Sequence, residues 1–379
     1  MEQPKTYDVA LIGGGLAGLN LSIQLAQDRH SVVLFEKETY PFHKVCGEYI
    51  SMESWNFLRE EIGLDLNKET IAFINKLWVT SPSGESLRSD LDLGGFGISR
   101  YKLDFLLKEM AIIKGVTILE NFKVEDVIFL NDNFSIKSSK GIFAAKVCCG
   151  TWGKRSNFDV KWKRFFTTKT SSRLNNYVGI KYHVKMNFED DVIALHNFKD
   201  GYCGISKIED DKYCVCYLTK ASNVKNAGSI KKAEEQILYQ NPHLKKVFEN
   251  MEHCYDAPLS ISQISFSKKD AVENNILMVG DSAGMITPLC GNGMSMAMHG
   301  SKLAADAISA FLLNKSTRKE MEKNYTLSWK SHFETRVATG KLVQYFFGRT
   351  AVTNMLVRFM KKSNFLTQKL IQLTHGKSF

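Results

Sequence analysis

The chain has 379 residues, of which 44% are hydrophobic and 24% are charged, with 26 glycines and 6 prolines. This composition is typical of a folded globular protein and excludes a disordered or low-complexity chain. No run of about 18 uncharged apolar residues occurs, and the N-terminus lacks the pattern of a signal peptide, so we expect a cytoplasmic protein. The eight cysteines match neither a CxxC pair nor a common zinc module, which predicts reduced thiols and no metal site.

The net charge of +10 is concentrated near the C-terminus. Eight basic and no acidic residues lie between Arg336 and Phe379, so the rest of the chain is nearly neutral. Because no nucleic-acid-binding motif accompanies these charges, we expect no nucleic-acid partner. The segment is predicted to be helical and amphipathic, and it either packs on the body of the protein or makes a peripheral contact with an anionic membrane.

The first part of the chain predicts a parallel βαβ unit. Residues 7–12 (YDVALI) form a strand, residues 13–18 (GGGLAG) a glycine turn that enters a helix, and residues 31–35 a second strand. In this unit the glycines allow a tight turn and a close approach of a pyrophosphate, and an acid after the second strand accepts hydrogen bonds from ribose hydroxyls. The expected contacts with a dinucleotide are Gly13, Gly15, Leu16, Ala17, Gly18, Glu36 and Lys37.

The middle of the chain changes character twice. A helix is predicted at 102–114 and a strand at 116–119, followed by β-hairpins between 126 and 150. From about 165 to 267 the pattern favours antiparallel strands, interrupted by one helix at about 229–241. The fold class is therefore α/β, with a mainly antiparallel segment inserted into a Rossmann-type unit.

A second loop with cofactor-binding character follows a buried strand at 275–279 and leads into a helix at about 292–313. Asp281 is suited to hold polyol hydroxyls, and the start of the helix offers its positive end to a ligand. The expected contacts are Gly280, Asp281, Pro288, Gly291, Gly293 and Met294. Two such loops about 260 residues apart favour FAD, a longer ligand than NAD.

Several segments together resemble a known family. The first glycine loop, residues 41–51 (PFHKVCGEYIS) and residues 280–305 are similar to the geranylgeranyl reductase branch of the para-hydroxybenzoate hydroxylase-like flavoproteins. Arg100 and Asp104 match the internal arginine-plus-aspartate pattern of that family. The likeness runs from residue 7 to about residue 310. It implies FAD as the cofactor, with Cys46, Gly47 and Arg100 among its contacts.

The resemblance also implies a division of the chain. We expect a discontinuous FAD-binding domain at 1–75, 98–164 and 268–335, with a substrate domain at 76–97 and 165–267. Residues 336–379 then form a basic C-terminal helical segment. The expected fold is thus a Rossmann-type FAD-binding domain with an inserted mainly antiparallel β substrate domain and a C-terminal helical tail.

This sequence departs from the family in three places. Residues 150–156 (GTWGKRS) carry Trp152 where the hydroxylases usually have an aspartate, which leaves the electron donor open between NAD(P)H and another source, including a reductase partner. The WxWxIP pattern of the halogenases is absent, which disfavours halogenation. The YxWxFP region of the reductases is matched only faintly at 202–207, so the substrate is not transferred from the family.

Cys46 is the candidate catalytic residue. In the resembling reductases this cysteine–glycine motif lies near the isoalloxazine ring, where a thiol would tune the flavin or donate a proton. The alternative is a small residue that fits a crowded turn before Gly47. Among its neighbours, His43 and Lys44 either assist electrostatically or face solvent, and Lys44 is expected to face solvent. Glu48 either acts as an acid or caps a loop, and a cap is expected for a loop carboxylate.

The sequence therefore predicts an FAD-dependent oxidoreductase that passes hydride between flavin N5 and an unsaturated, lipophilic substrate. One alternative is an FAD-dependent monooxygenase that hydroxylates an aromatic or polyketide-like substrate. Another is a non-catalytic flavoprotein whose basic tail docks on a membrane or a partner.

Overall fold

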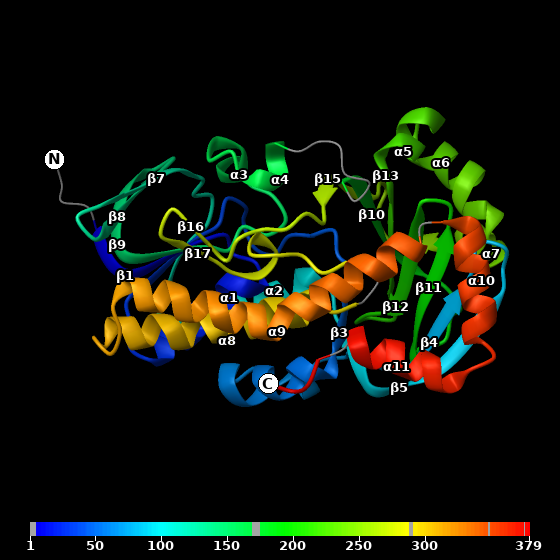
Figure 1. The fold of residues 1–379 in the computed structure, drawn as a ribbon, viewed down its shortest axis with the longest axis horizontal. Coiled ribbons are helices and arrows are strands. Elements are labelled where there is room, and N and C mark those ends of the chain that lie inside the picture. The colour runs from blue at the N-terminus through cyan, green and yellow to red at the C-terminus, as the bar shows by residue number, and fades with distance from the viewer. Residues whose placement is uncertain (1–4, 169–174, 288–290, 348, 375) are drawn as a thin grey trace.

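The computed structural model describes residues 5–168, 175–287, 291–347, 349–374 and 376–379. Two β-sheets lie at opposite ends of the long axis of the molecule, and long helices run along that axis (Figure 1). The predicted α/β class is confirmed by this arrangement.

The first sheet has the strand order β16–β17–β9–β1–β2–β6, and the remaining two strands extend it, since β8 pairs with β9 and β7 pairs with β8. Strand β1 pairs in parallel with β2 and β9, and alternate residues of β1 are buried on opposite faces of the sheet. The predicted βαβ unit and the hairpins before residue 150 are thus confirmed. The strands are β1 Lys5–Ile12, β2 Val32–Phe35, β6 Thr117–Leu119, β7 Val124–Leu130, β8 Asn133–Ser138, β9 Gly141–Gly150, β16 Val272–Glu273 and β17 Ile276–Met278.

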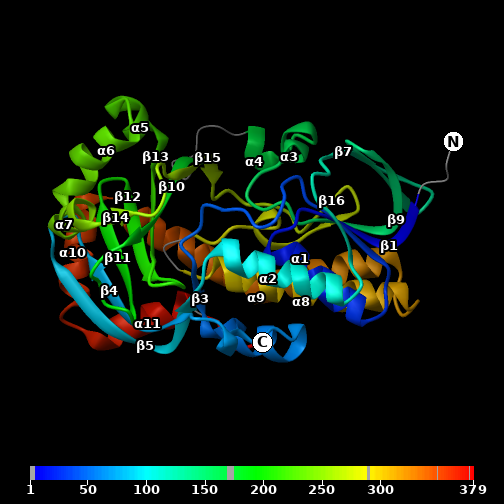
Figure 2. The same ribbon diagram turned by 180° about the vertical axis from the view of Figure 1, so that it is seen from behind.

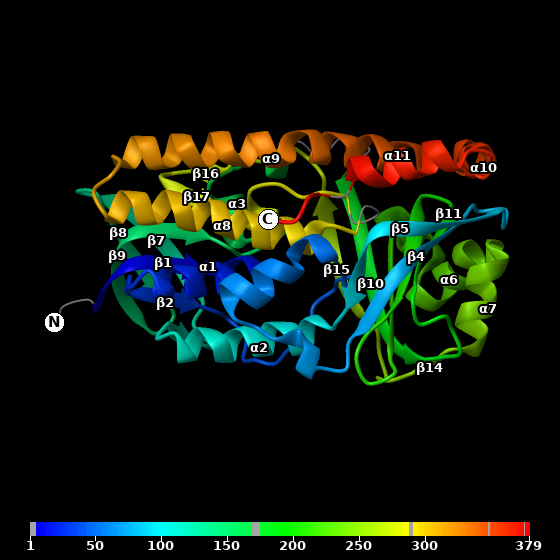
Figure 3. The same ribbon diagram turned by 90° about the horizontal axis from the view of Figure 1, so that it is seen from below.

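Four helices cover the first sheet on one side: α1 (Leu16–Gln27), α2 (Arg100–Ile113), α8 (Gly293–Leu312) and α9 (Arg318–Phe347). Helix α1 packs between α2 and α8, and α9 packs against α8 (Figures 2 and 3). Two short helices, α3 (Asn157–Lys161) and α4 (Phe165–Thr168), come directly after β9 in the chain. This packing brings the glycine turn before α1 close to the start of α8.

The second sheet has the order β14–β10–β13–β12–β11–β4–β5–β3, with β15 paired to β10. Its pairs are antiparallel except for β4 with β11. The expected domain boundary at residue 75 falls inside β4. The strands are β3 Tyr49–Ser51, β4 Ala72–Thr80, β5 Ser86–Gly97, β10 Asn175–Lys185, β11 Val192–Phe198, β12 Gly201–Lys207, β13 Tyr213–Lys220, β14 Glu252–His253 and β15 Leu259–Ser265.

The helix predicted at about 229–241 is present as α6 (Ile230–Ile237), which continues into a 3-10 turn at Leu238–Gln240. It is not the one helix of this segment, because α5 (Ala221–Ala227) precedes it and α7 (Pro242–Asn250) follows it. Helix α7 restarts at Pro242, which lacks an N–H group, and the Asn241 side chain caps it by accepting from the His243 N–H at 3.0 Å.

The C-terminal segment is helical, as predicted, but its first helix begins earlier than residue 336. Helix α9 runs from residue 318 to 347 because Met321, Tyr325 and Phe333 keep one face fully buried. Helices α10 (Thr350–Met360) and α11 (Asn364–Thr374) then pack against β5 of the second sheet (Figure 3). Within the described residues no helix is long and apolar enough to span a bilayer, and the predicted membrane contact stays a prediction.

Candidate active site

The glycine turn between β1 and α1 has three tightly defined positions. Gly13 adopts φ +114°, and a Cβ there would lie 2.7 Å from the Thr151 carbonyl oxygen. A Cβ on Gly18 would lie 2.2 Å from the Gly13 oxygen, so helix and strand touch at this point. At Gly15 the nearest atoms to an added Cβ are the Arg100 Nη2 at 3.6 Å and the Lys44 Nζ at 3.8 Å. The turn therefore opens toward two cations at Gly15.

Glu36 is buried directly after β2, and its carboxylate hydrogen-bonds to the backbone of the glycine turn. Its Oε2 accepts from the Gly14 N–H at 2.8 Å, and its Oε1 accepts from the Glu38 N–H at 3.1 Å. Lys37, in contrast, is exposed and pairs with Glu38 at 3.5 Å. The structure thus places Glu36 beside the turn and Lys37 away from it.

The two cations share one buried carboxylate. Arg100 donates from Nε and Nη2 to Asp104 at 2.8 Å each, and Lys44 Nζ donates to the same carboxylate at 2.9 Å and to the Gly14 oxygen at 3.3 Å. Burial acts to raise the pKa of Asp104, but Arg100 and Lys44 hold it below its usual value. The expectation that Lys44 faces solvent is therefore wrong, because Asp104 on α2 draws its ammonium inward.

The second loop meets the first at the start of α8. Gly280 adopts φ +73°, and its Cβ position lies 3.0 Å from the Cβ of Ala17. Lys269 lies buried beneath this loop and donates to the backbone oxygens of Asp281 at 2.7 Å and Lys154 at 2.8 Å, and burial lowers its pKa to about 8. Pro288 lies outside the described residues.

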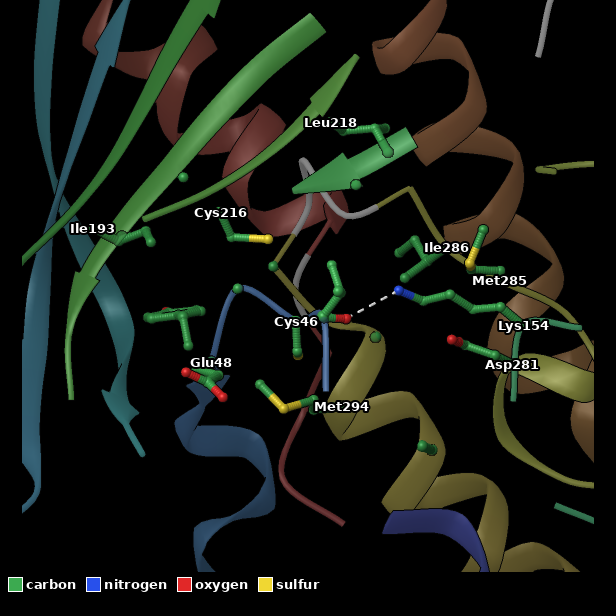
Figure 4. A pocket seen from close by; sticks show the side chains of 18 of the residues that line it. Cys46, Glu48, Lys154, Ile193, Cys216, Leu218, Asp281, Met285, Ile286 and Met294 are labelled. Carbon is green, nitrogen blue, oxygen red and sulfur yellow. Dashed lines mark hydrogen bonds between the residues drawn. The ribbon is translucent and has the colours of Figure 1, made fainter. Parts of the chain in front are cut away.

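The loop that carries Cys46 is fixed by side chains from three strands of the second sheet. Lys181 donates to the Lys44 oxygen at 3.1 Å, the Cys214 thiol to the Cys46 oxygen at 3.3 Å, and the Ser206 hydroxyl to the Gly47 oxygen at 3.3 Å. From the first-sheet side, Lys154 Nζ reaches the Val45 oxygen at 3.3 Å (Figure 4). Sequence reasoning missed these contacts because each joins residues more than a hundred positions apart.

Glu48 has a different environment from the expected loop cap. It adopts φ +56°, and its side chain is fully buried. Its carboxylate accepts from the Arg100 N–H at 2.8 Å and from His183 Nε2 at 2.6 Å, and it pairs with the Lys181 ammonium. Burial acts to raise the pKa of Glu48, but Lys181 and His183 hold it below the usual value. Cys214 also lies near this carboxylate and His183, and Lys181 supplies the cationic charge of the cluster.

A cavity of about 290 Å³ joins these parts where the two sheets meet (Figure 4). Eleven of the expected cofactor contacts line it: Gly15, Leu16, Ala17, Cys46, Gly47, Arg100, Gly280, Asp281, Gly291, Gly293 and Met294. The cavity lining does not include four of the expected contacts: Gly13, Gly18, Glu36 and Lys37. The first three instead fix the glycine turn beside the cavity.

The far part of the cavity is apolar and belongs to the second sheet and the C-terminal helices. The strands contribute Leu77, Val79, Leu91, Ile193, Leu195, Tyr202, Leu218 and Ile264, and helices α9 to α11 contribute Val343, Met360, Thr367 and Ile371. The C-terminal segment thus covers this part of the cavity, a role that its sequence did not reveal.

Comparison with known proteins yields sequence relatives that are 22–26% identical to this chain. No family model matches the chain. It is 26% identical to conditioned medium factor receptor 1 of Dictyostelium discoideum, covering 90% of this chain and 71% of the relative. It is 23% identical to digeranylgeranylglycerophospholipid reductase 1 of Methanococcoides burtonii, covering 90% of this chain and 84% of the relative.

Two solved structures share the fold of this protein over nearly its whole chain. A flavin-dependent brominase superimposes with a TM-score of 0.78 at 20% identity, covering 98% of this chain and 93% of the other. A geranylgeranyl bacteriochlorophyll reductase-like protein from Thermoplasma acidophilum gives a TM-score of 0.78 at 18% identity, covering 100% and 97%. The chain therefore shares its fold with a flavin-dependent brominase and with a reductase-like protein. Both reductases and halogenases occur among the relatives of this chain, so its fold alone does not assign the reaction.

Proposed function

We propose that this protein is an FAD-dependent reductase that transfers hydride between flavin N5 and an unsaturated, lipophilic substrate. The observation that carries the proposal is the cavity, which continues from the two glycine loops, past Cys46, into an apolar part under α9 to α11. An apolar substrate would lie there out of contact with water.

FAD would supply the hydride-transferring ring, and residues of both loops would hold it. The open face of Gly15, with Arg100 and Lys44 beside it, fits a pyrophosphate, and the buried Glu36 at the end of β2 fits an adenosine ribose. Asp281 and the start of α8 fit the ribityl and flavin end. The expected domain division follows the same line: residues 1–75, 98–164 and 268–335 would bind FAD, and residues 76–97 and 165–267 the substrate.

Replacing Asp281 with alanine is expected to weaken FAD binding by about ten- to a hundredfold, since a hydrogen bond to a charged group contributes about 1.5–3 kcal/mol. Fluorescence titration of the flavin-free protein with FAD measures this change. Asp270→Ala removes a nearby exposed carboxylate and serves as the control. Equal affinity in the two variants would remove Asp281 from the cofactor site.

The apolar end of the cavity provides a test of the substrate class. Met360 on α10 lines it, whereas Met355 on the same helix is 65% exposed. Met360→Trp is expected to slow turnover of a long isoprenoid lipid about 5- to 150-fold, because overfilling a packed space costs about 1–3 kcal/mol, while Met355→Trp retains the wild-type rate. A Met360→Trp protein as active as wild type on that lipid would place the substrate elsewhere.

Anaerobic turnover separates the reductase from the alternatives. The protein is reduced with dithionite, excess reductant is removed, and a digeranylgeranyl glycerophospholipid in detergent is added without oxygen. Flavin reoxidation together with saturated lipid, identified by mass spectrometry, supports the reductase. A product that forms only when oxygen is admitted supports a monooxygenase, and a stably bound flavin without turnover of any substrate supports the non-catalytic role. Replacing dithionite by NADPH or NADH tests the electron donor.

A further inference from the structure

A second cavity, of about 220 Å³, adjoins the network around Glu48. Its lining consists of His43, Lys181, Tyr182, His183, Tyr255, Ala257 and Leu259. Lys181 and His183 are both buried, and both hold the carboxylate of Glu48. Because Glu48 itself lines the first cavity, the network connects the two cavities.

The contacts form a continuous path. His43 packs edge-on to the His183 ring at a centroid distance of 5.3 Å, and Tyr255 lies edge-on to His43 at 4.9 Å. His183 Nε2 lies 2.6 Å from Glu48 Oε2, within hydrogen-bond distance. Tyr255 is 49% exposed, so the second cavity reaches the surface beside it. A proton that enters at the surface therefore meets imidazole and carboxylate groups in turn.

Stability alone gives little reason for such a network. Replacing a buried ion pair by well-packed apolar residues is often neutral or stabilising, because desolvation of the charges offsets their attraction. A proton path explains the residue types better, since imidazole and carboxylate both exchange protons readily. The network also lies directly behind the loop that carries Cys46.

We propose that His183 and Glu48 conduct protons from the second cavity to the first. The inference rests on the proposed function, because reduction of a carbon–carbon double bond by hydride consumes one proton in each turnover. His183 takes up a proton at Nδ1 from water in the second cavity and gives its Nε2 proton to Glu48 Oε2. The new O–H bond then breaks as the proton passes to the reacting group in the first cavity, which returns Glu48 to its anionic form. Rotation of the imidazole ring brings the remaining N–H back toward Glu48 and restores the starting state of His183.

The groups around Glu48 set the protonation states along this path. Lys181 stays beside the carboxylate as a positioning residue that favours its ionised form between transfers. Burial and Lys181 lower the pKa of His43, which keeps this ring neutral beside His183. The titratable or charged groups that interact with Glu48 from the surrounding elements are His43, Arg100, Lys181, His183, Cys214 and Cys216.

Two variants of His183 test the route. Reoxidation of the bound, reduced flavin by oxygen takes up one proton and releases hydrogen peroxide, so it needs no knowledge of the substrate. His183→Ala is expected to slow it about tenfold or more, and imidazole added to the buffer should restore the rate. Pyrazole has nearly the same shape but is too weak a base to take up a further proton at neutral pH, so it should not. His183→Gln keeps a hydrogen-bond donor to Glu48 and should remain slow. His30→Ala, which removes a histidine that lines neither cavity, should react at the wild-type rate.

The flavin-free protein gives a second readout. Histidine-selective NMR should show a hydrogen-bonded Nε2 proton on His183 in the wild type, and this signal should be lost in Glu48→Ala because the acceptor is gone. Absence of that proton in the wild type, a wild-type reoxidation rate in His183→Ala, or equal rescue by pyrazole and imidazole would each overturn the route. A wild-type protein that cannot bind FAD would instead contradict the proposed function itself.

Discussion

Glu48→Ala is expected to lower the free energy of unfolding of the flavin-free protein by about 3–5 kcal/mol. The variant leaves the Lys181 ammonium buried without its anion, and it also removes the acceptor of the Arg100 N–H and of His183. Urea denaturation followed by circular dichroism measures the change.

A double variant separates the charge effect from the loss of packing. Glu48→Leu combined with Lys181→Met removes both charges and keeps apolar volume, so it should be more stable than Glu48→Ala alone. An alanine variant as stable as wild type would show that Lys181 finds another partner or loses its proton at little cost.

The destabilisation should also depend on pH. The pKa of Glu48 is lower in the folded state than its ordinary value of 4.5. The ionised carboxylate therefore stabilises the fold above that ordinary pKa, and this contribution is lost as the pH falls through the lower, folded-state pKa. The difference between wild type and Glu48→Ala should accordingly be full at neutral pH and shrink in acid.

Gly15→Asp is expected to abolish FAD binding while leaving the fold intact. The nearest atoms to an added Cβ at Gly15 are the ends of two flexible side chains, 3.6 and 3.8 Å away, so the protein accommodates a small side chain. A carboxylate there would occupy the approach of the pyrophosphate and pair with Arg100 and Lys44 in its place. Two like charges about 4 Å apart repel by about 4 kcal/mol at a protein surface, which corresponds to an affinity loss of about a thousandfold.

Gly15→Ala is the matched control for this prediction. It adds only a methyl group and should weaken binding far less than the aspartate. Titration with FAD gives the affinities, and circular dichroism verifies the fold of each variant. An aspartate variant that retains FAD would place the pyrophosphate away from the glycine turn.

Local backbone requirements explain why the first βαβ unit and the second loop could be predicted. Gly13 and Gly18 are confined by contacts with Thr151 and with the turn itself, so their identities signal the fold directly. The start of α7 at Pro242 also has a signal in the sequence, because proline is favoured in the first turn of a helix, but this further helix was not predicted.

The charged parts of the site could not be predicted in the same way. Lys44 and Glu48 look like ordinary loop residues, and their partners Asp104 and Lys181 lie 60 and 133 positions away. Only the folded chain brings the members of each pair together. A buried charge is stable only beside an opposite charge, and the sequence does not show which residue provides it. The same holds for Met360 and Ile371, whose role in covering the cavity depends on how α10 and α11 pack on the second sheet.

The central claim is that the cavity between the two sheets holds FAD through the residues of both glycine loops. The most direct test is the visible spectrum of the purified protein, followed by denaturation and identification of the released cofactor. The account predicts the absorption of a bound, oxidised flavin and the release of one FAD per chain, both lost in Gly15→Asp. A colourless protein that FAD does not reconstitute would contradict it.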